Sequence, residues 1–318
     1  MIPLAVLCGG PSLEHEISLR TGHEVLEHLD RTRFAPIAVR IEKNGDWNVD
    51  GEAVGDALAG VQALRDRGID TCFLALHGPF GEDGRVQAFL ETSRLRYTGS
   101  GPTACAVSGD KIHAKRIAAT HGIRMADDLL VPPGRVDEIE SRLGYPCVVK
   151  DPVQGSTLGM EITADRDALT GAIERLGKHC DRLLVERSVP GREFTVAVLD
   201  LPPDGPRVLP LVEIVARDGY FDFEEKYSES GAEEICPAPI EGPAAERMSA
   251  WALTAHIAFG MRQMSRTDFR LPPEGDPVFL ETNSIPGLTA RSLYPMAAAE
   301  AGISFPELLT RLIDDARR

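Results

Sequence analysis

The chain has 318 residues, which is more than one hydrophobic core usually organises, so two or three domains are expected. Hydrophobic residues make up 43% and charged residues 26%, a balance typical of soluble globular proteins. The net charge of −15 argues against nonspecific binding to nucleic acids or anionic membranes, but it leaves nucleotide binding open, because local lysines and backbone N–H groups meet phosphates.

The six cysteines are scattered, with neither a C-x-x-C pair nor a His–Cys metal spacing. They indicate reduced thiols in a cytoplasmic protein. The apolar N-terminus is short and lacks basic residues, so it predicts a first strand rather than a signal peptide. No apolar stretch approaches the length needed to span a membrane.

The first hundred residues alternate between strands and helices. The expected strands are Pro3–Cys8, Ala35–Ile41, Thr71–Leu76 and Arg96–Thr98, and the expected helices are Glu16–Leu29 and Val86–Glu91. The first strand is a continuous apolar run closed by two glycines, which is typical of a buried strand. This alternation predicts a parallel sheet that ends near Gly101 and Pro102, the first domain boundary.

The rest of the chain mixes helices with strands rich in β-formers. The expected helices are Asp110–His121, Asp165–Gly177 with Asp165 as N-cap, Pro243–Met261 and Phe305–Arg317. The expected strands are Ala126–Val131, Cys147–Lys150, Met160–Thr163, Leu183–Glu186, Glu193–Asp200 and Val208–Val215. The aromatic and charged segment Gly219–Pro239 lacks periodicity and is long for a loop, so it predicts a functional flap.

The stretch from Phe279 to Pro295 carries the most informative pattern. Glu281 and Asn283 lie two residues apart in an expected strand and therefore face the same side. A hairpin through 271–277 would bring Asp268 beside Glu281. Oxygen ligands of this kind suit Mg²⁺, so the three side chains predict a nucleotide–metal site. The alternative is a solvated polar strand end.

Two stretches were tested as phosphate loops, since no G-x-x-x-x-G-K-[ST] motif occurs. Residues 99–104 fit a dinucleotide fingerprint, but no acid follows about 20 residues on, so a turn between domains explains them better. In 148–160 a strand delivers Lys150, and the loop then supplies Gly155, Ser156, Thr157 and Gly159. Such a loop offers backbone N–H and hydroxyl donors to phosphate. The alternative is a Gly/Ser turn with an exposed lysine.

Eight stretches, in order from about residue 4 to 310, together resemble the D-alanine–D-alanine ligases of the ATP-grasp superfamily. They are LCGGPSLEHEISLRTG, LALHGPFGEDG, DKIHAK, VVKDPVQGSTLGM, LLVERSVPGREFTV, FDFEEKYSE, SRTDF and FLETNSIPGLTARSLYP. The resemblance implies an α/β protein with the three-domain ATP-grasp fold. Residues 1–102 would form a parallel-sheet domain, and two α+β domains, 103–184 and 185–318, would enclose ATP.

The resemblance also implies roles for single residues. Toward the substrates it implies Glu14, His77, Arg266, Gly287, Ser292 and Leu293. Toward ATP it implies Lys111, Lys150, Ser156, Thr157, Glu186, Arg187, Val189, Glu193 and Lys226. Toward the metal it implies Asp268, Glu281 and Asn283. Tyr227 would join Ser156 and Glu14 in holding the flap over the first D-alanine.

The implied activity is the ligation of two D-alanines with ATP and two Mg²⁺ ions, or Mn²⁺, for peptidoglycan precursors. A cytoplasmic homodimer without nucleic-acid or membrane partners is expected. Two alternatives stay open: a related ligase with D-lactate, D-serine or another amino acid as acceptor, and a non-catalytic nucleotide-binding paralogue. The second is disfavoured, because every catalytic position is filled.

The chain departs from the family pattern at a few positions. Asp151 stands where proline is usual, and strand alternation is expected to point it away from Lys150 and the phosphates. Replacing it with proline is therefore expected to do little. Gln154 stands for a common acid, Thr157 for a serine and Ser284 for a threonine, and none of these changes removes a group that the chemistry needs.

Overall fold

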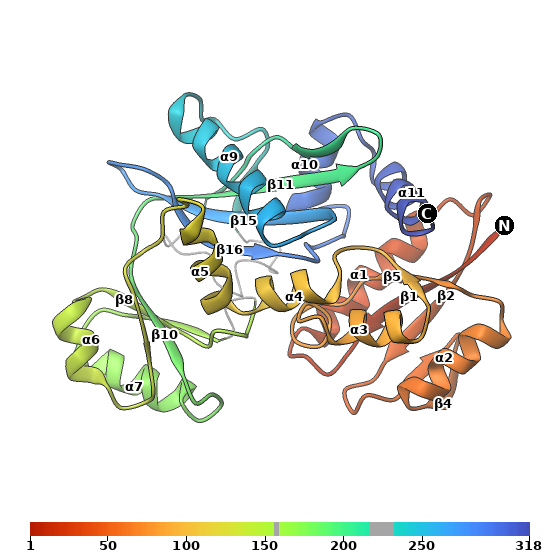
Figure 1. The fold of residues 1–318 in the computed structure, drawn as a ribbon, viewed down its shortest axis with the longest axis horizontal. Coiled ribbons are helices and arrows are strands. Elements are labelled where there is room, and N and C mark those ends of the chain that lie inside the picture. The colour runs from red at the N-terminus through yellow and green to blue at the C-terminus, as the bar shows by residue number, and fades with distance from the viewer. Residues whose placement is uncertain (156–158, 216–231) are drawn as a thin grey trace.

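The computed structural model describes residues 1–155, 159–215 and 232–318 (Figure 1). The described part of the chain forms three sheets that follow one another in sequence. In Figure 1 the N-terminal sheet lies at lower right, the middle sheet at lower left and the C-terminal sheet above both. No helix in the described part is long and apolar enough to cross a membrane.

The N-terminal sheet has the order β4-β3-β2-β1-β5-β6. Its parallel strands are β1 (Ile2–Gly9), β2 (Phe34–Ile41), β5 (Thr71–Leu74) and β6 (Arg96–Tyr97), which confirms the predicted parallel pairing. The helices α1 (His15–His28) and α3 (Arg85–Thr92) match the prediction. The antiparallel β3 (Trp47–Val49) and β4 (Glu52–Gly55) and the helix α2 (Ala57–Asp66) were not predicted. The two strands are too short to show periodicity.

The middle sheet is antiparallel, with the order β7-β10-β8-β9. Its strands are β7 (Asp128–Val131), β8 (Cys147–Lys150), β9 (Met160–Thr163) and β10 (Leu183–Arg187). The helices α6 (Val136–Arg142), which was not predicted, and α7 (Arg166–Leu176) bury Ile139, Leu169 and Ile173 against it. Asp165 caps α7 by accepting from the Ala168 N–H, as predicted.

The C-terminal sheet has the order β14-β13-β11-β15-β16 and is antiparallel. Its strands are β11 (Arg192–Leu201), β12 (Gly205–Val208), β13 (Val212–Val215), β14 (Glu233–Ile235), β15 (Gln263–Leu271) and β16 (Val278–Asn283), with β12 paired on the side to β11. The single strand predicted over 208–215 was wrong. Leu209 turns its N–H to the Ala197 carbonyl, and Pro210, which has no N–H, follows, so the run splits into β12 and β13.

Five helices complete the described fold: α4 (Pro102–Gly109), α5 (Lys111–Thr120), α9 (Pro243–Ala258), α10 (Leu293–Glu300) and α11 (Phe305–Ala316). Ala114 and Ala118 of α5 share a core with Phe194 and Phe269. This contact anchors α5 on the C-terminal sheet. A charged side chain of α5 that contacts the middle sheet therefore comes from a helix that is packed on a different sheet.

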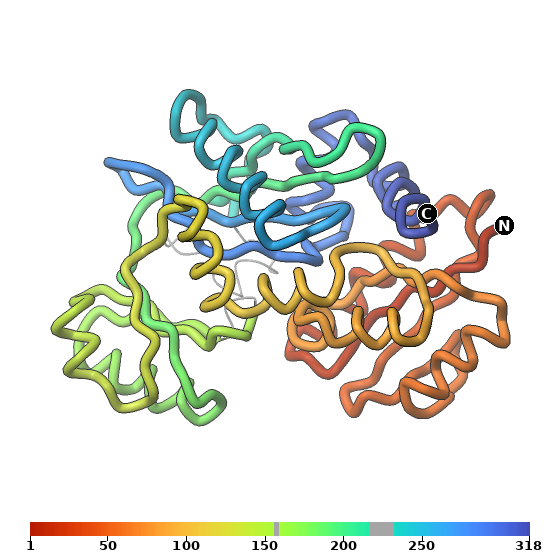
Figure 2. The backbone as a smooth tube through the Cα atoms, in the orientation of Figure 1, coloured from red at the N-terminus to blue at the C-terminus, as the bar shows by residue number. Residues whose placement is uncertain are grey.

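The cores divide the molecule in an informative way. One continuous hydrophobic cluster joins the N-terminal strands to α10 and α11, whereas the middle sheet has a cluster of its own. Figure 2 shows the middle segment as a separate lobe, while the last helix lies against the N-terminal part. The division at residues 102 and 184 remains a prediction. The six cysteines are free thiols, as expected.

Candidate active site

A cavity lies between the middle sheet and the C-terminal sheet. Apolar side chains from both sheets line part of it, among them Val148, Met160 and Leu280. The lining includes residues that were predicted for the site, namely Lys111, Lys150, Glu186, Arg187, Val189, Glu193, Asp268 and Glu281. Its polar part also includes Asp151, Gln154, Ser188 and Arg270. A cavity with one apolar part and converging charges is suited to a nucleotide, which has a flat base and charged phosphates.

The middle sheet contributes a buried ion-pair cluster. Lys150, the last residue of β8, lies 2.5 Å from Glu186 of the neighbouring β10. Lys115 of α5 pairs with the same carboxylate and reaches Asp128 of β7 at 2.8 Å. Burial alone would raise the pKa of Glu186, but the two lysines outweigh it and lower the pKa to about 2. Glu186 is therefore an anion at neutral pH.

The sequence analysis missed Lys115, although a signal was present. Lys111 and Lys115 lie four residues apart in an expected helix and therefore share one face. Ala114 and Ala118 pack that helix on the C-terminal sheet, while Lys115 crosses to Glu186. A lysine that is 2% exposed needs such an anion, because an unpaired buried charge is very unfavourable.

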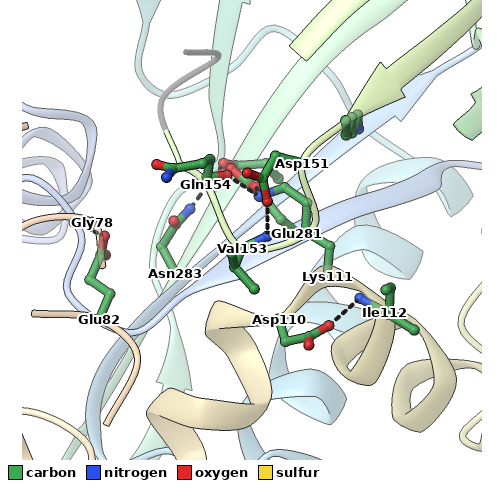
Figure 3. Close-up of polar contacts among 12 residues, drawn as sticks. Gly78, Glu82, Asp110, Lys111, Ile112, Asp151, Val153, Gln154, Glu281 and Asn283 are labelled. Carbon is green, nitrogen blue, oxygen red and sulfur yellow. Dashed lines mark hydrogen bonds and ion pairs between the residues drawn. The ribbon is translucent and has the colours of Figure 1, made fainter. Parts of the chain in front are cut away.

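Lys111 links the two sides of the cavity. Asp110 caps α5 by accepting from the Ile112 N–H at 2.9 Å, which places Lys111 in the first turn (Figure 3). The Lys111 Nζ donates to the Gln154 carbonyl at 2.8 Å and lies 3.0 Å from Glu281 Oε2. Burial lowers the pKa of Lys111, but Glu281 outweighs it and raises the pKa, so the ammonium keeps its charge.

The metal-side residues lie on the hairpin that the sequence predicted. Asp268 of β15 stands directly opposite Glu281 of β16, and Arg266 stands opposite Asn283. Arg266 donates to both Asp268 oxygens, at 2.9 and 2.8 Å. Thr195 donates to Oδ1 at 2.6 Å, and the Asn283 amide lies 3.3 Å from Oδ2. The predicted approach of these three oxygen-bearing side chains is confirmed.

These residues fit a divalent cation in donor chemistry. Two carboxylates and one amide offer the hard oxygen ligands that Mg²⁺ prefers. Their present counter-charges are Lys111 on Glu281 and Arg266 on Asp268. Within residues 1–155, 159–215 and 232–318, no three His, Cys, Asp or Glu side chains gather as a ligand cluster, so the third protein ligand would be Asn283.

A second, polar pocket adjoins the cavity and is lined by Gly78 and Glu82 from the N-terminal part together with Lys111 and Glu281. Glu14 lies beside Gly78 at its edge. Glu14, at the start of α1, is buried, and its N–H donates to Ser12 Oγ at 3.0 Å. Ser12 in turn donates to the His77 carbonyl at 2.8 Å. A Cβ on Gly78 would lie 2.5 Å from Glu14 Oε2, and one on Gly155 would lie 3.1 Å from it. Glu14 therefore lies between the His77 loop and the loop after β8.

His77 is a neutral imidazole at physiological pH. Burial, and then the positive charge of Arg266, lower the pKa of His77 to about 4. Its Nε2 lies 2.9 Å from Thr21 Oγ1. The side chain therefore serves as a hydrogen-bonding group of fixed orientation rather than as a cation.

Glu82 is a further residue of this pocket that the sequence analysis did not single out. Its carboxylate accepts from the Gly78 N–H at 2.7 Å (Figure 3). Burial, and then the nearby Glu14, raise the pKa of Glu82 to about 8. Glu82 therefore keeps its proton at neutral pH, and a cationic group such as an ammonium bound beside it would favour its ionised form.

The loop after β16 carries the remaining substrate-side residues. A Cβ on Gly287 would lie 2.9 Å from Ser292 Oγ, so only glycine fits there without a shift. Ser292 is the N-cap of α10, and its Oγ bonds the Thr289 hydroxyl at 2.8 Å. Leu293 begins α10, where the backbone N–H has no acceptor within the helix.

Other residues predicted for the nucleotide side also line the cavity. Glu193 lies 3.0 Å from Arg270, and both line the cavity. Arg187 ends β10, and Ser188 and Val189 follow it along the same wall. Ser156, Thr157, Lys226 and Tyr227 lie outside the described residues, as does most of the predicted flap. Of that segment, 233–235 form β14.

The expectation for Asp151 was wrong in its premise. The strand β8 ends at Lys150, so side-chain alternation does not extend to the next residue. Asp151 is 5% exposed and lines the same cavity as Lys150. Its Oδ1 accepts from the Val153 N–H at 3.0 Å, and its own N–H donates to the Gly159 carbonyl.

Two family models match the chain. The D-ala D-ala ligase N-terminus covers residues 3–100, and the D-ala D-ala ligase C-terminus covers residues 118–314. The D-alanine–D-alanine ligase of Nitrosomonas europaea is 37% identical, and the match covers 98% of this chain and 96% of the relative. That of Syntrophobacter fumaroxidans is 38% identical, with 98% and 97% covered.

Solved structures agree with these matches. The D-alanine–D-alanine ligase of Bacillus anthracis complexed with ATP has a TM-score of 0.79 at 28% identity, covering 100% of this chain and 98% of that one. The D-Ala:D-Ser ligase VanG of Enterococcus faecalis has a TM-score of 0.83 at 29% identity, with 99% of both chains covered. The fold is therefore the ATP-grasp fold, and this chain belongs to the D-alanine–D-alanine ligase family.

Proposed function

We propose that this chain uses ATP to join two D-alanines into D-alanyl-D-alanine, a precursor of peptidoglycan. The observation that carries the proposal is the position of Lys111. Its Nζ lies between the carbonyl of Gln154 in the loop after β8 and the carboxylate of Glu281. Phosphate donors, metal-side oxygens and the Glu14 pocket thus meet around one side chain, as a phosphoryl transfer to a small amino acid requires.

The reaction has two steps. A carboxylate oxygen of the first D-alanine attacks the γ-phosphorus of ATP, ADP leaves, and an acyl phosphate forms. The amine of the second D-alanine then attacks the acyl carbon, loses a proton, and expels inorganic phosphate. Lys111 and Lys150 hold the phosphates, and the Arg266 guanidinium and the Gly287 N–H face the oxyanion of the tetrahedral intermediate.

The two amino acids would bind at separate sets of groups. Glu14 receives the ammonium of the first D-alanine, with neutral His77 beside it. Ser292 Oγ and the free Leu293 N–H at the start of α10 receive the carboxylate of the second, because a helix N-terminus attracts anions. Glu186 with the 187–189 backbone receives the adenine, and Glu193 receives the ribose.

Asp268, Glu281 and Asn283 would hold two Mg²⁺ ions, with Mn²⁺ as a substitute, and Glu281 would bridge them. Such ions, when bound, offset the negative charge that builds up on the transferring phosphoryl group. In their absence Lys111 and Arg266 balance the same carboxylates. We further propose that the protein is a cytoplasmic homodimer, which light scattering of the purified chain tests.

The activity is tested by phosphate release and product analysis with ATP, Mg²⁺ and a panel of D- and L-amino acids and D-hydroxy acids. We expect D-alanyl-D-alanine as the main product. The likeness to a D-Ala:D-Ser ligase makes D-serine the acceptor to compare first. If the enzyme releases phosphate with D-alanine alone but forms mainly D-alanyl-D-serine when D-alanine and D-serine are supplied together, it belongs with the related ligases that use another acceptor. No turnover with any acceptor would favour a non-catalytic paralogue.

Tyr227 provides a finer test of acceptor choice. The family resemblance links it to Ser156 and Glu14, and members that make the D-lactate ester typically lack it. Phenylalanine would leave these partners unpaired, at a cost of about 1–3 kcal/mol. We predict that Tyr227→Phe raises the ratio of D-alanyl-D-lactate to dipeptide when both acceptors are supplied. An unchanged ratio would mean that Tyr227 does not take part in acceptor choice.

A further inference from the structure

The backbone of Asp151 closes the base of the loop after β8. The paired strands β8 and β9 end at Lys150 and Met160. The Asp151 N–H donates to the Gly159 carbonyl at 2.7 Å and so adds one more rung to that ladder. The two ends are in close contact, since a Cβ on Gly159 would lie 3.0 Å from the Asp151 Cβ and 2.7 Å from that of Gln154. One hydrogen bond thus sets where the loop leaves and re-enters the sheet.

The side chain of Asp151 shapes the first part of the loop. Its Oδ1 accepts from the Val153 N–H at 3.0 Å, an Asx turn that fixes the chain direction through Pro152 (Figure 3). This turn presents the Pro152 carbonyl to the Lys111 N–H at 2.9 Å. Two residues further on, the Gln154 carbonyl accepts a hydrogen bond from the Lys111 Nζ at 2.8 Å.

Lys111 passes this geometry on to the metal side. Its ammonium lies 3.0 Å from Glu281 Oε2 while it holds the Gln154 carbonyl. A displaced loop would pull this ammonium away or leave one of its partners unpaired. The position of Lys111 therefore depends in part on the turn that the Asp151 side chain stabilises.

We propose that Asp151 is a positioning residue of the nucleotide site, acting through its N–H on Gly159 and its carboxylate on the Val153 N–H. The inference rests on the proposed function, because it takes the loop after β8 to receive phosphates. It reverses the expectation that proline would be tolerated at position 151. Proline has neither the N–H nor the side-chain acceptor.

The capping role and the charge of Asp151 act in opposite directions. An amide oxygen accepts from a backbone N–H as a carboxylate does, so Asp151→Asn keeps the turn. The same substitution removes a negative charge from the phosphate cavity, where that charge repels the nucleotide. Asp151→Ala keeps the backbone bond to Gly159 but removes the turn, and Asp151→Pro removes both.

The test measures Mg-ADP affinity by calorimetry, and the KM values for ATP and D-alanine, in the full-length variants. We expect Asp151→Asn to bind ADP within about twofold of wild type or more tightly, since the turn is retained. Asp151→Ala should weaken ADP binding and raise the KM for ATP by about tenfold, the usual effect of one lost hydrogen bond. The KM for D-alanine should move by less than about twofold. Asp151→Pro should weaken ADP binding further.

Asp165 provides the control, because its carboxylate also accepts from a backbone N–H close in sequence in the same lobe, there as the N-cap of α7. It accepts from the Ala168 N–H at 2.9 Å, is exposed, and lies outside the cavity. Asp165→Ala should lower the melting temperature about as much as Asp151→Ala but leave ADP affinity unchanged. Equal loss of ADP affinity in both variants would assign the effect to general destabilisation and overturn the proposal.

Two other results would overturn the proposal: wild-type ADP affinity in Asp151→Ala, or equal weakening in Asp151→Asn and Asp151→Ala. Should Asp151→Pro fail to fold, the Asn and Ala variants still decide. A wild-type protein that binds Mg-ADP but forms no D-alanyl-D-alanine would refute the proposed function. The ADP affinities of the variants would then still test the role of Asp151.

Discussion

The two walls of the nucleotide cavity are built in different ways. On the C-terminal wall, Asp268 and Glu281 face each other because β15 and β16 are adjacent strands of one hairpin. On the opposite wall, Glu186 is held by Lys150 from another strand and by Lys115, which lies 71 residues away in sequence. Both walls are paired strands with ion pairs, but the first carboxylates are placed opposite each other by one ladder, whereas Glu186 also depends on a buried lysine that reaches it from the helix α5.

This difference predicts that substitutions on the two walls affect turnover and stability to different extents. Removing a carboxylate from the hairpin leaves the backbone ladder intact, so the loss should appear in turnover. Removing Lys115 from the ion-pair cluster leaves two carboxylates, Glu186 and Asp128, with one buried cation fewer, so the loss should appear in stability as well.

Lys115→Met should cause the largest loss, and it should be a loss of stability. Glu186 would keep only Lys150, and Asp128 would lose its buried partner. Breaking a buried pair from one side costs about 3–5 kcal/mol. Urea unfolding measures the change, with Lys178→Met as control, since Lys178 is exposed and should change stability by less than about 0.5 kcal/mol. Equal midpoints for the two variants would contradict the account of this wall.

Glu281→Gln should abolish most turnover while the fold is retained. The negative charge proposed to bridge the two metal ions is lost, but the β15–β16 ladder does not depend on the side chain. We expect a loss of about 2–4 kcal/mol in transition-state stabilisation, as when one preorganised electrostatic group is removed. Asp276→Asn is the matched control, because this exposed carboxylate ends the same hairpin loop and pairs only with Arg247 among the described residues. Wild-type turnover of Glu281→Gln at saturating Mg²⁺ would refute the bridging role.

Lys150→Ala should weaken the use of ATP much more than the use of D-alanine. The KM for ATP should rise by an amount that corresponds to about 1.5–3 kcal/mol of lost binding free energy, the range for a hydrogen bond to a charged group. The KM for D-alanine should change much less, because Lys150 contacts Glu186 and not the Glu14 pocket. Steady-state kinetics with each substrate varied separately gives both values. A larger rise in the KM for D-alanine than in the KM for ATP would contradict the proposal that Lys150 binds the phosphates of ATP.

The smallest effect is expected from the protonation of His77. Its pKa is lowered to about 4, below the ordinary value of 6.5. Its neutral form therefore persists as pH falls through 6.5, and only below about pH 4 does it protonate in the folded protein. Since the unfolded chain takes up the proton first, His77 destabilises the fold progressively below pH 6.5. A His77 ring resonance in NMR that stays constant between pH 8 and 5 is expected, and a midpoint near 6.5 would contradict it.

The same logic applied to Glu186 gives an acid limit for stability. Its folded pKa of about 2 lies below its usual value of 4.5. The stabilisation is therefore complete above pH 4.5 and is lost as pH falls from 4.5 toward 2. In Lys115→Met this acid sensitivity should be weaker, because one of the two lysines that lower the pKa is gone.

Much of this protein followed from local patterns. The alternating strands and helices of the first hundred residues, the Asp165 cap and the β15–β16 hairpin were all predicted, and the structure confirms them. These features depend on neighbours in sequence: strand alternation puts Glu281 and Asn283 on one face, and a short hairpin fixes their partner strand. The resemblance to the ligase family depends on such stretches, because each retains its functional residue within a few positions.

Only the tertiary structure decided the rest. No local rule places Lys115 on Glu186, since α5 is anchored on the C-terminal sheet and its charges cross to another. The environment of Asp151 was predicted wrongly, because alternation holds only inside a strand and β8 ends one residue earlier. Burial and charge partners also set the pKa values of His77 and Glu186. Sequence fixes which groups are present and their local spacing, whereas electrostatic environment depends on distance in space, which only the folded chain defines.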